Sequence, residues 1–125
     1  MLALMQENIA LNLLGDGVAA SVFNWGSSGS PLHPVPGGSG HPDVILAADC
    51  VYFEPAFPLL QQTLWDLVGA NTTCYFCFKK RRRADQHFMS KVKKQFAVEE
   101  VTDDPEKDVY ASENIFLYII RAKAK

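Results

Sequence analysis

Residues 43–52 read Asp-Val-Ile-Leu-Ala-Ala-Asp-Cys-Val-Tyr, and this stretch decides the class of fold. The unbroken apolar run at 44–46 predicts a strand that is covered on both faces, as in a parallel sheet. Two small alanines follow, then Asp49 and, three positions later, Tyr52. Because ligands of open α/β sheets gather at the carboxyl ends of strands, we expect a binding site where this strand ends.

Length and composition describe one folded domain. The 125 residues are 48% hydrophobic and 21% charged, with a formal net charge of -2. At this length roughly two-thirds of the unfolded surface can be buried. The balanced charge disfavours a nucleic-acid partner, and the apolar runs are far shorter than the ~20 residues that span a bilayer. We therefore expect a cytoplasmic protein that contacts neither nucleic acid nor membrane.

The basic residues are confined to one part of the chain. Residues 1–78 contain no Lys or Arg, and eight of the 12 basic residues lie between Lys79 and Lys94. The five consecutive basic residues at 79–83 are compatible with a nucleic-acid or nuclear-localisation patch, or with a solvated loop between a strand and a helix. We favour the loop. Because it follows the carboxyl end of a predicted strand, we expect it on the crevice side, where it could attract an acidic partner surface.

The three cysteines do not predict a disulfide framework, and their odd number fits a reducing compartment. Cys74 and Cys77 have the spacing of a metal knuckle or a redox pair. They lie, however, in a predicted strand, where residues three apart face opposite sides. The three histidines are dispersed along the chain. We therefore predict no metal site.

Hydrophobic periodicity predicts helices and strands that alternate along the chain. The expected elements, in chain order, are helix 2–13, strand 20–25, strand 43–48, helix 55–68, strand 72–78, helix 84–96, strand 97–101, turn 102–108 and strand 114–120. The last strand is apolar enough for burial on both faces, and we expect it to form a hairpin with the strand before it. The segment from Gly26 to Pro42 is rich in glycine and proline and predicts a loop.

The strand end Asn24-Trp25-Gly26, together with Asp49 and Tyr52, resembles the seven-strand (class I) S-adenosylmethionine-dependent methyltransferases. The strongest resemblance is to the protein-lysine methyltransferase subgroup, which includes enzymes that methylate translation elongation factors. That subgroup carries Trp-Gly after its third strand and Asp-x-x-Tyr after its fourth. The resemblance implies an α/β, Rossmann-like fold, of which residues 1–125 form the carboxyl-terminal portion, with parallel strands, crossover helices and a terminal antiparallel hairpin. The Gly/Pro-rich segment at about 26–42 looks like an insert in this partial domain.

The resemblance also implies roles for four residues. Trp25 would flank the adenine of S-adenosylmethionine and Ala48 would line the same pocket, while Asp49 and Tyr52 would face the substrate lysine. These residue types suit the chemistry, because a carboxylate can orient an ammonium group and an aromatic ring holds a cation with ~0.5 to 2 kcal/mol. The implied reaction is lysine N-methylation of a protein, with a translation elongation factor as the expected substrate. Taken singly, Asp49 could instead cap the next helix, and the two aromatic residues could serve packing alone.

One expected feature of such a fold is missing from the sequence. No Gly-x-Gly-x-x-Gly occurs between a strand and a helix, although related folds hold their cofactor with a Gly-rich turn. We therefore expect a truncated methyltransferase that is inactive alone and that exposes unpaired strand edges. Two alternatives stay open at this stage. One is a non-catalytic interaction module that pairs these edges with another chain, and the other is a nucleic-acid binder that uses the basic loop.

Overall fold

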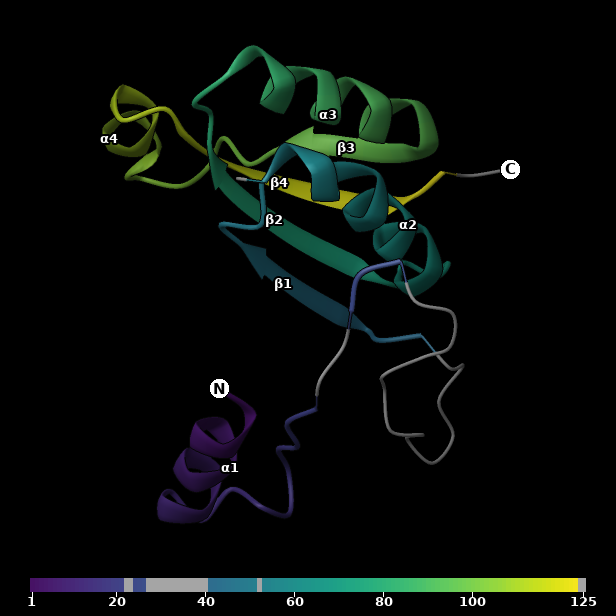
Figure 1. The fold of residues 1–125 in the computed structure, drawn as a ribbon. Helices are drawn as coiled ribbons and strands as arrows, with labels where there is room; N and C mark the ends of the chain where they lie inside the picture. The colour runs from purple at the N-terminus through teal and green to yellow at the C-terminus, as the bar shows by residue number, and fades with distance from the viewer. Residues whose placement is uncertain (22–23, 27–40, 52, 124–125) are drawn as a thin grey trace.

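A four-stranded mixed sheet forms the centre of the molecule (Figure 1). The computed structural model describes residues 1–21, 24–26, 41–51 and 53–123. The strands are β1 (Val44–Ala48), β2 (Thr73–Lys79), β3 (Phe96–Glu100) and β4 (Ile115–Ala122). They lie in the order β1-β2-β4-β3, with β1 parallel to β2, and β4 antiparallel to both of its neighbours. The predicted α/β, Rossmann-like class and the terminal antiparallel pair are confirmed.

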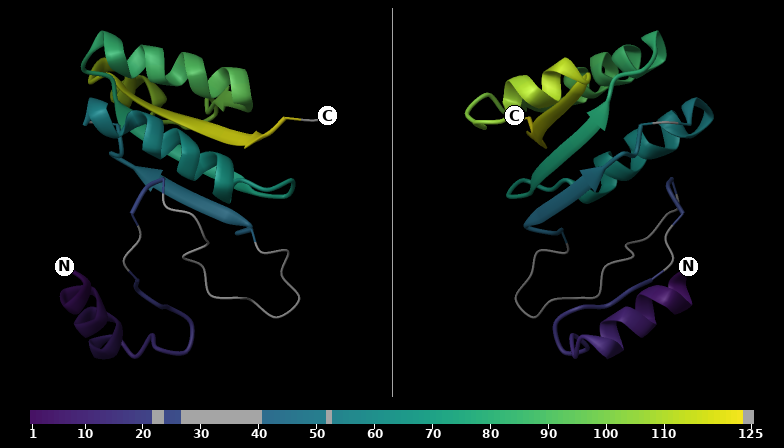
Figure 2. Two further views of the ribbon diagram at one scale, coloured as in Figure 1. Left: turned by 45° about the vertical axis from the view of Figure 1, so that its right-hand side comes forward. Right: turned by 90° about the vertical axis from the view of Figure 1, so that its left-hand side faces the viewer.

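Two helices cover one face of this sheet. The helices are α1 (Leu2–Leu11), α2 (Phe57–Leu67), α3 (Arg83–Gln95) and α4 (Lys107–Ser112), with a 3-10 turn, η1 (Glu54–Ala56), before α2. Figures 1 and 2 both show α2 and α3 side by side over the same face, with α1 lying apart from the sheet. No residue of α1 is buried. The three long helices begin and end within two residues of the predicted bounds, once η1 is counted with α2.

The hydrophobic core lies between the sheet and these two helices. Along β2, Cys74, Phe76 and Phe78 are buried and point toward the helices, as the two-residue period of a strand requires. Phe88 of α3 joins the layers, because its ring centroid lies 5.2 Å from that of Phe57 and 6.1 Å from that of Phe76. We call this side of the sheet the covered face.

The opposite side, the open face, carries apolar side chains without a covering layer in the described part of the chain. Leu46 pairs with Tyr75 on this face and is 80% exposed, and Val44 is 55% exposed. The prediction that this strand is covered on both faces is therefore wrong here. An apolar run indicates that a strand suits burial, but it does not supply the layer that would bury it. Beyond β1 the described residues include no further strand, so its outer edge is unpaired, as expected.

Three other expectations need correction. The described residues of segment 20–25 are not in a strand, and residues 22–23 lie outside the described residues. A strand requires a hydrogen-bonded neighbour, and the described residues of this segment pair with none of the four strands. The predicted turn at 102–108 leads into α4, which separates β3 from β4. Of β4, only Tyr118 and Ile120 are buried, both toward the covered face. Most of the predicted insert, residues 27–40, lies outside the described residues.

Candidate active site

Asp49 follows directly after β1 and turns the chain at the carboxyl edge of the sheet. Its φ angle is 56°, in the left-handed region, which Asp and Asn enter more readily than other side chains. Its backbone N–H donates a hydrogen bond of 3.0 Å to the carbonyl of Cys77 at the end of β2. The side chain is 73% exposed. The turn therefore presents a carboxylate to solvent from a backbone that the neighbouring strand holds.

The reading of Asp49 as a helix cap is wrong. The 3-10 turn η1 has Phe53 at its amino-terminal cap and α2 has Ala56, and neither cap makes a side-chain hydrogen bond. Asp49 lies several residues before both positions. The left-handed backbone of a non-glycine residue is instead a feature found often at functional sites.

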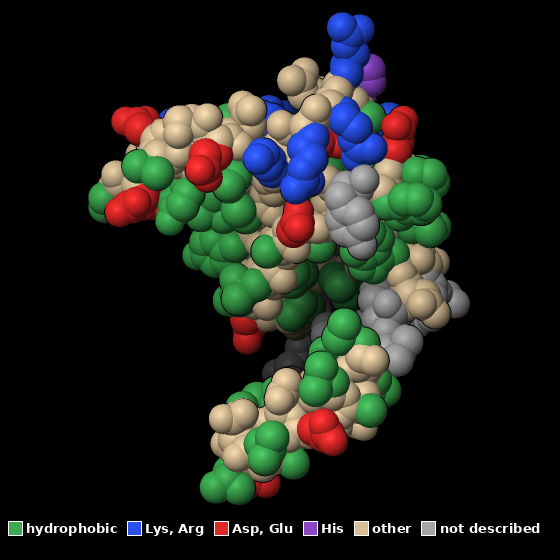
Figure 3. Space-filling view, turned by 60° about the vertical axis from the view of Figure 1, so that its left-hand side comes forward, with side chains coloured by type: hydrophobic (Ala, Val, Ile, Leu, Met, Phe, Trp, Pro, Cys, Tyr) green, Lys and Arg blue, Asp and Glu red, His purple; other side chains and the backbone are tan. Residues whose placement is uncertain are grey.

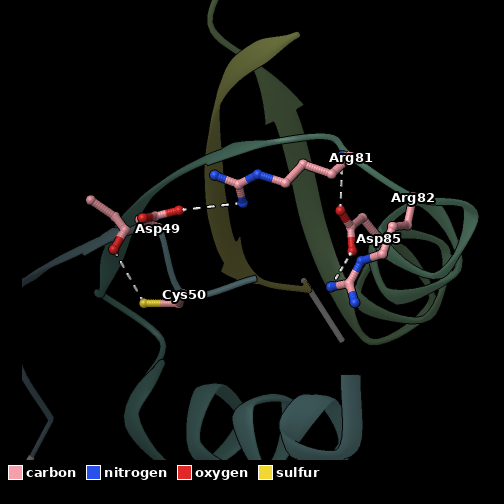
Figure 4. Close-up of polar contacts among 6 residues, drawn as sticks. Asp49, Cys50, Arg81, Arg82 and Asp85 are labelled. Atoms are coloured by element: carbon pink, nitrogen blue, oxygen red, sulfur yellow. Dashed lines mark hydrogen bonds and ion pairs between the residues drawn. The ribbon is translucent and has the colours of Figure 1, made fainter. Parts of the chain in front are cut away.

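A basic side chain from the next strand end contacts this carboxylate. Arg81 Nη1 lies 3.7 Å from Asp49 Oδ1 (Figure 4). Arg81 belongs to the loop between β2 and α3, and β2 is parallel to β1, so both segments reach the same edge of the sheet. The expectation that the basic loop lies at the rim is confirmed. Exposed ion pairs of this kind contribute only about 0 to 1 kcal/mol, because water and salt screen them.

Asp85 holds the basic loop in place. This residue lies in the first turn of α3 and is fully buried. Its Oδ2 accepts a hydrogen bond of 3.0 Å from the backbone N–H of Arg81, and its Oδ1 lies 3.3 Å from Arg82 Nη2 (Figure 4). A buried carboxylate needs such partners to compensate for lost hydration. The sequence pattern did not predict a role for this residue, because its only signal was an acidic side chain in a first helical turn.

Lys80, in the same loop, is held by Phe116 of β4 and by Asn114, which directly precedes β4. Its Nζ atom lies 4.4 Å from the ring centroid of Phe116, and its backbone N–H donates to the carbonyl of Asn114 at 2.8 Å. Figure 3 shows Lys and Arg side chains gathered at one end of the molecule. The segment 79–83 therefore joins a strand to a helix, as we favoured: Lys79 ends β2, Arg83 begins α3, and residues 80–82 form the loop between them, each with a separate partner.

The cysteines near the site are not activated nucleophiles. Cys74 and Cys77 face opposite sides of β2, as predicted. Burial, with a smaller effect of the neighbouring Cys50, raises the pKa of Cys74 to about 11. Burial and then the charge of Asp49 also raise the pKa of Cys50 and of Cys77. All three are thiols near neutral pH, whereas nucleophiles and metal ligands are thiolates. Among the described residues, no three His, Cys, Asp or Glu side chains gather into a group that could hold a metal.

Gly26 lies against α2, directly after Trp25. The indole is half-buried and packs partly against the core. The Gly26 N–H donates to Thr63 Oγ1 at 2.9 Å, and a Cβ atom on Gly26 would lie 2.7 Å from Leu59 Cδ2. With its φ of 82°, this position suits glycine, because a side chain would be both strained and crowded.

The four side chains that the sequence placed around one site differ in position. Asp49 lies at the rim beside Arg81, and the adjacent Ala48 is exposed and paired with Cys77 on the open face. Trp25 packs instead against the core of the covered face. The structure does not bring Trp25 and Ala48 together on one face, so their joint role in cofactor binding stays a prediction. Tyr52 lies outside the described residues.

The structure combines a mixed sheet, a helical layer on one face and a carboxylate at a strand end. Sequence comparison identifies the class of protein to which this chain belongs. A sequence model of the lysine methyltransferase family matches residues 1–95, and the chain belongs to this family.

Individual relatives agree with that assignment. Over 94% of its length, the chain is 37% identical to protein-lysine N-methyltransferase EFM6 of Saccharomyces cerevisiae, of which it covers 50%. It is 34% identical to protein N-lysine methyltransferase METTL21A of Danio rerio, over 74% of this chain and 40% of the relative. It is 38% identical to EEF1A lysine methyltransferase 3 of Mus musculus, over 62% of this chain and 31% of the relative. The chain thus spans about half the length, or less, of these curated relatives.

None of the helices in the described ranges combines the length and the apolar character that crossing a membrane requires.

Proposed function

We propose that this chain forms the substrate side of an S-adenosylmethionine-dependent protein-lysine N-methyltransferase, and that Asp49 holds the amine of the target lysine. The observation that supports this most is the position of Asp49, exposed at the carboxyl edge of a parallel strand pair in a left-handed turn. Membership of the lysine methyltransferase family gives this position its chemical meaning.

The proposed role of Asp49 is to orient the lysine before transfer. An amine attacks a methyl group only when it is neutral and in line with the bond that breaks. A carboxylate at the rim attracts the ammonium form and keeps the nitrogen in place as its proton leaves. Asp49 is thus a residue that would contact substrate, and Tyr52, three positions on, would hold the cation with its ring.

S-adenosylmethionine would supply the methyl group when bound, and the residues present fit one side of a site for it. Ala48 is small and exposed, so the end of β1 leaves a flat ligand room to approach the backbone. Trp25 packs against the core of the covered face, so its contribution of an aromatic surface to the same site rests on the resemblance alone. The sequence contains no Gly-rich turn between a strand and a helix to complete the other side.

A translation elongation factor is the proposed substrate. The name of one relative, EEF1A lysine methyltransferase 3, supports a substrate of this kind. Translation takes place in the cytoplasm. We therefore propose that this protein acts there.

A fusion protein tests the proposal. The chain would be joined to the half of the yeast relative that it does not match, and transfer of a labelled methyl group to elongation factor 1A would be measured. We expect transfer by the fusion and a loss of kcat of at least about 100-fold in Asp49→Asn, because positioning contributes strongly to such rates. Asp43→Asn is the matched control, since this residue precedes the same strand at its other end.

Cofactor binding and methyl transfer together decide which role Asp49 has. Binding of S-adenosylmethionine should survive in the Asp49→Asn fusion, because the carboxylate is assigned to the substrate. Equal rates for Asp49→Asn and Asp43→Asn would exclude Asp49 from the reaction. Calorimetric titration of the 125-residue chain alone with S-adenosylmethionine should show no micromolar binding. Micromolar affinity would show that a Gly-rich turn is dispensable.

One observation favours a second candidate function, a non-catalytic interaction module. The outer edge of β1 is unpaired among the described residues, and Leu46 beside it is 80% exposed. Exposed edges and apolar side chains of this kind pair with other chains. This alternative predicts a stable protein complex in the absence of cofactor, which analytical ultracentrifugation of the chain with the candidate partner would detect.

A further inference from the structure

The carboxylate assigned to the substrate already has a cation of its own chain beside it. Arg81 Nη1 lies 3.7 Å from Asp49 Oδ1, which is the distance of an ion pair (Figure 4). A lysine ammonium that approaches Asp49 therefore meets a guanidinium at the same rim. The two cations cannot both use this carboxylate without repelling each other.

The backbone of the loop at Arg81 is held in place, whereas the guanidinium group of Arg81 can move. The backbone N–H of Arg81 is held by the buried carboxylate of Asp85 at 3.0 Å. The neighbouring residue Arg82 also contacts Asp85, and Lys80 lies over the ring of Phe116. The side chain of Arg81 is 44% exposed, so its path to another partner runs through solvent and requires no core movement.

We propose that Arg81 exchanges partners when substrate binds. The target lysine takes the carboxylate of Asp49, and the guanidinium of Arg81 turns to a carboxylate that adjoins this lysine in the substrate. The inference rests on the proposed function, since it assumes that Asp49 receives the lysine. The proposed substrates are proteins in which the target lysine is adjacent to Asp or Glu. Arg81 is then a specificity-determining residue.

Charge balance explains why the neighbour of the lysine must be acidic. The Asp49–Arg81 pair holds one negative and one positive charge, and a lysine alone would leave two positive charges on one carboxylate. A substrate Asp or Glu restores neutrality. The exposed Asp49–Arg81 pair is weak, so breaking it changes affinity by less than about fivefold. Because guanidinium and carboxylate groups also pair with two parallel hydrogen bonds, the new contact favours a defined register of the substrate.

Binding of short fluorescent peptides to the full 125-residue chain tests this inference without requiring methyl transfer. One peptide contains Lys-Glu, a second contains Lys-Gln, and a third replaces the lysine of the first with norleucine. For the unmodified chain, we expect the change from Glu to Gln to weaken binding about fivefold at low salt. In Arg81→Gln this loss should shrink to less than about twofold, since the partner of the glutamate is gone.

Arg83→Gln is the matched control, because it removes the same charge from the same loop at the first residue of α3. It should keep the preference of the unmodified chain for Lys-Glu. Circular dichroism of each variant checks that the fold is retained. An Arg83→Gln chain that loses the preference as fully as Arg81→Gln would overturn the inference and leave only a general attraction by the basic loop.

The peptide set separates this inference from the proposed function. If norleucine weakens binding but Glu and Gln bind alike, the exchange is wrong and the assignment of lysine to Asp49 stands. If norleucine binds as well as lysine, both are wrong. Failure of all three peptides to bind also overturns the exchange, whereas the methyl-transfer assay of the fusion judges the proposed function independently.

Discussion

The two faces of the sheet have similar apolar sequences but different surroundings. On the covered face, Phe76 is fully buried and its ring contacts those of Phe78 and Phe88. On the open face, Leu46 is 80% exposed although it belongs to an equally apolar strand. An apolar side chain therefore stabilises this fold only where another layer excludes water from it. The candidate site lies where both faces end, at the carboxyl edge of β1 and β2.

Truncating one side chain on each face should give the largest difference. Phe88→Ala should reduce the free energy of unfolding by about 3 to 5 kcal/mol, because it opens a cavity between α2, α3 and the sheet. Leu46→Ala should change it by less than about 1 kcal/mol, since little buried area is lost. Urea denaturation followed by circular dichroism measures both. Similar losses for the two variants would mean that a layer covers the open face in solution.

The buried carboxylate behind the basic loop should give the next largest effect. Asp85→Ala should reduce the free energy of unfolding by about 1 to 3 kcal/mol, because the backbone N–H of Arg81 and the guanidinium of Arg82 lose their acceptor. The exposed Asp103→Ala serves as the control and should leave stability nearly unchanged. Equal unfolding midpoints for these two variants would contradict the buried position of Asp85.

The left-handed turn at the rim should respond to backbone preference alone. Asp49→Ala should reduce the free energy of unfolding by about 1 kcal/mol, because alanine is strained at a φ of 56°. Asp49→Asn and Asp49→Gly should not show this loss, since both residues tolerate the region. The three variants would be compared by thermal and urea unfolding. If alanine is as stable as asparagine, the turn is not left-handed in solution.

The last expected effect concerns one thiol; it is absent at neutral pH and appears only at alkaline pH. Burial raises the pKa of Cys74 from 9.0 to about 11, so the folded state keeps this proton longer than the unfolded state does. Stability from this source is present below pH 9.0 and is lost as the pH rises to about 11. The unmodified chain should therefore lose more stability than Cys74→Ala between these limits, as measured by urea unfolding at each pH. A parallel decline of both proteins would show that Cys74 does not titrate differently on folding.

Thiol position and the site were predicted from the sequence to different degrees. The two-residue period placed Cys74 and Cys77 on opposite sides of a strand, and the structure confirms this. The strand end identified Asp49 as a rim residue, whereas an acidic side chain in a first helical turn did not by itself predict the role of Asp85, whose burial depends on how α3 packs. Trp25 was grouped with Ala48 through a resemblance, whereas the structure places Trp25 against the core. Their joint role in cofactor binding stays a prediction, because it depends on contacts between segments that lie far apart in the sequence.

The sequence by itself determined the periods of the helices and strands, the α/β class and the strand that ends at Asp49. These features depend on residues within a few positions of one another, where backbone geometry links spacing directly to direction. Only the tertiary structure decided which face of the sheet is covered, that Arg81 reaches Asp49, and that Asp85 is buried behind the loop. Burial and ion pairing depend on distances between segments, and those distances are set when the layers pack.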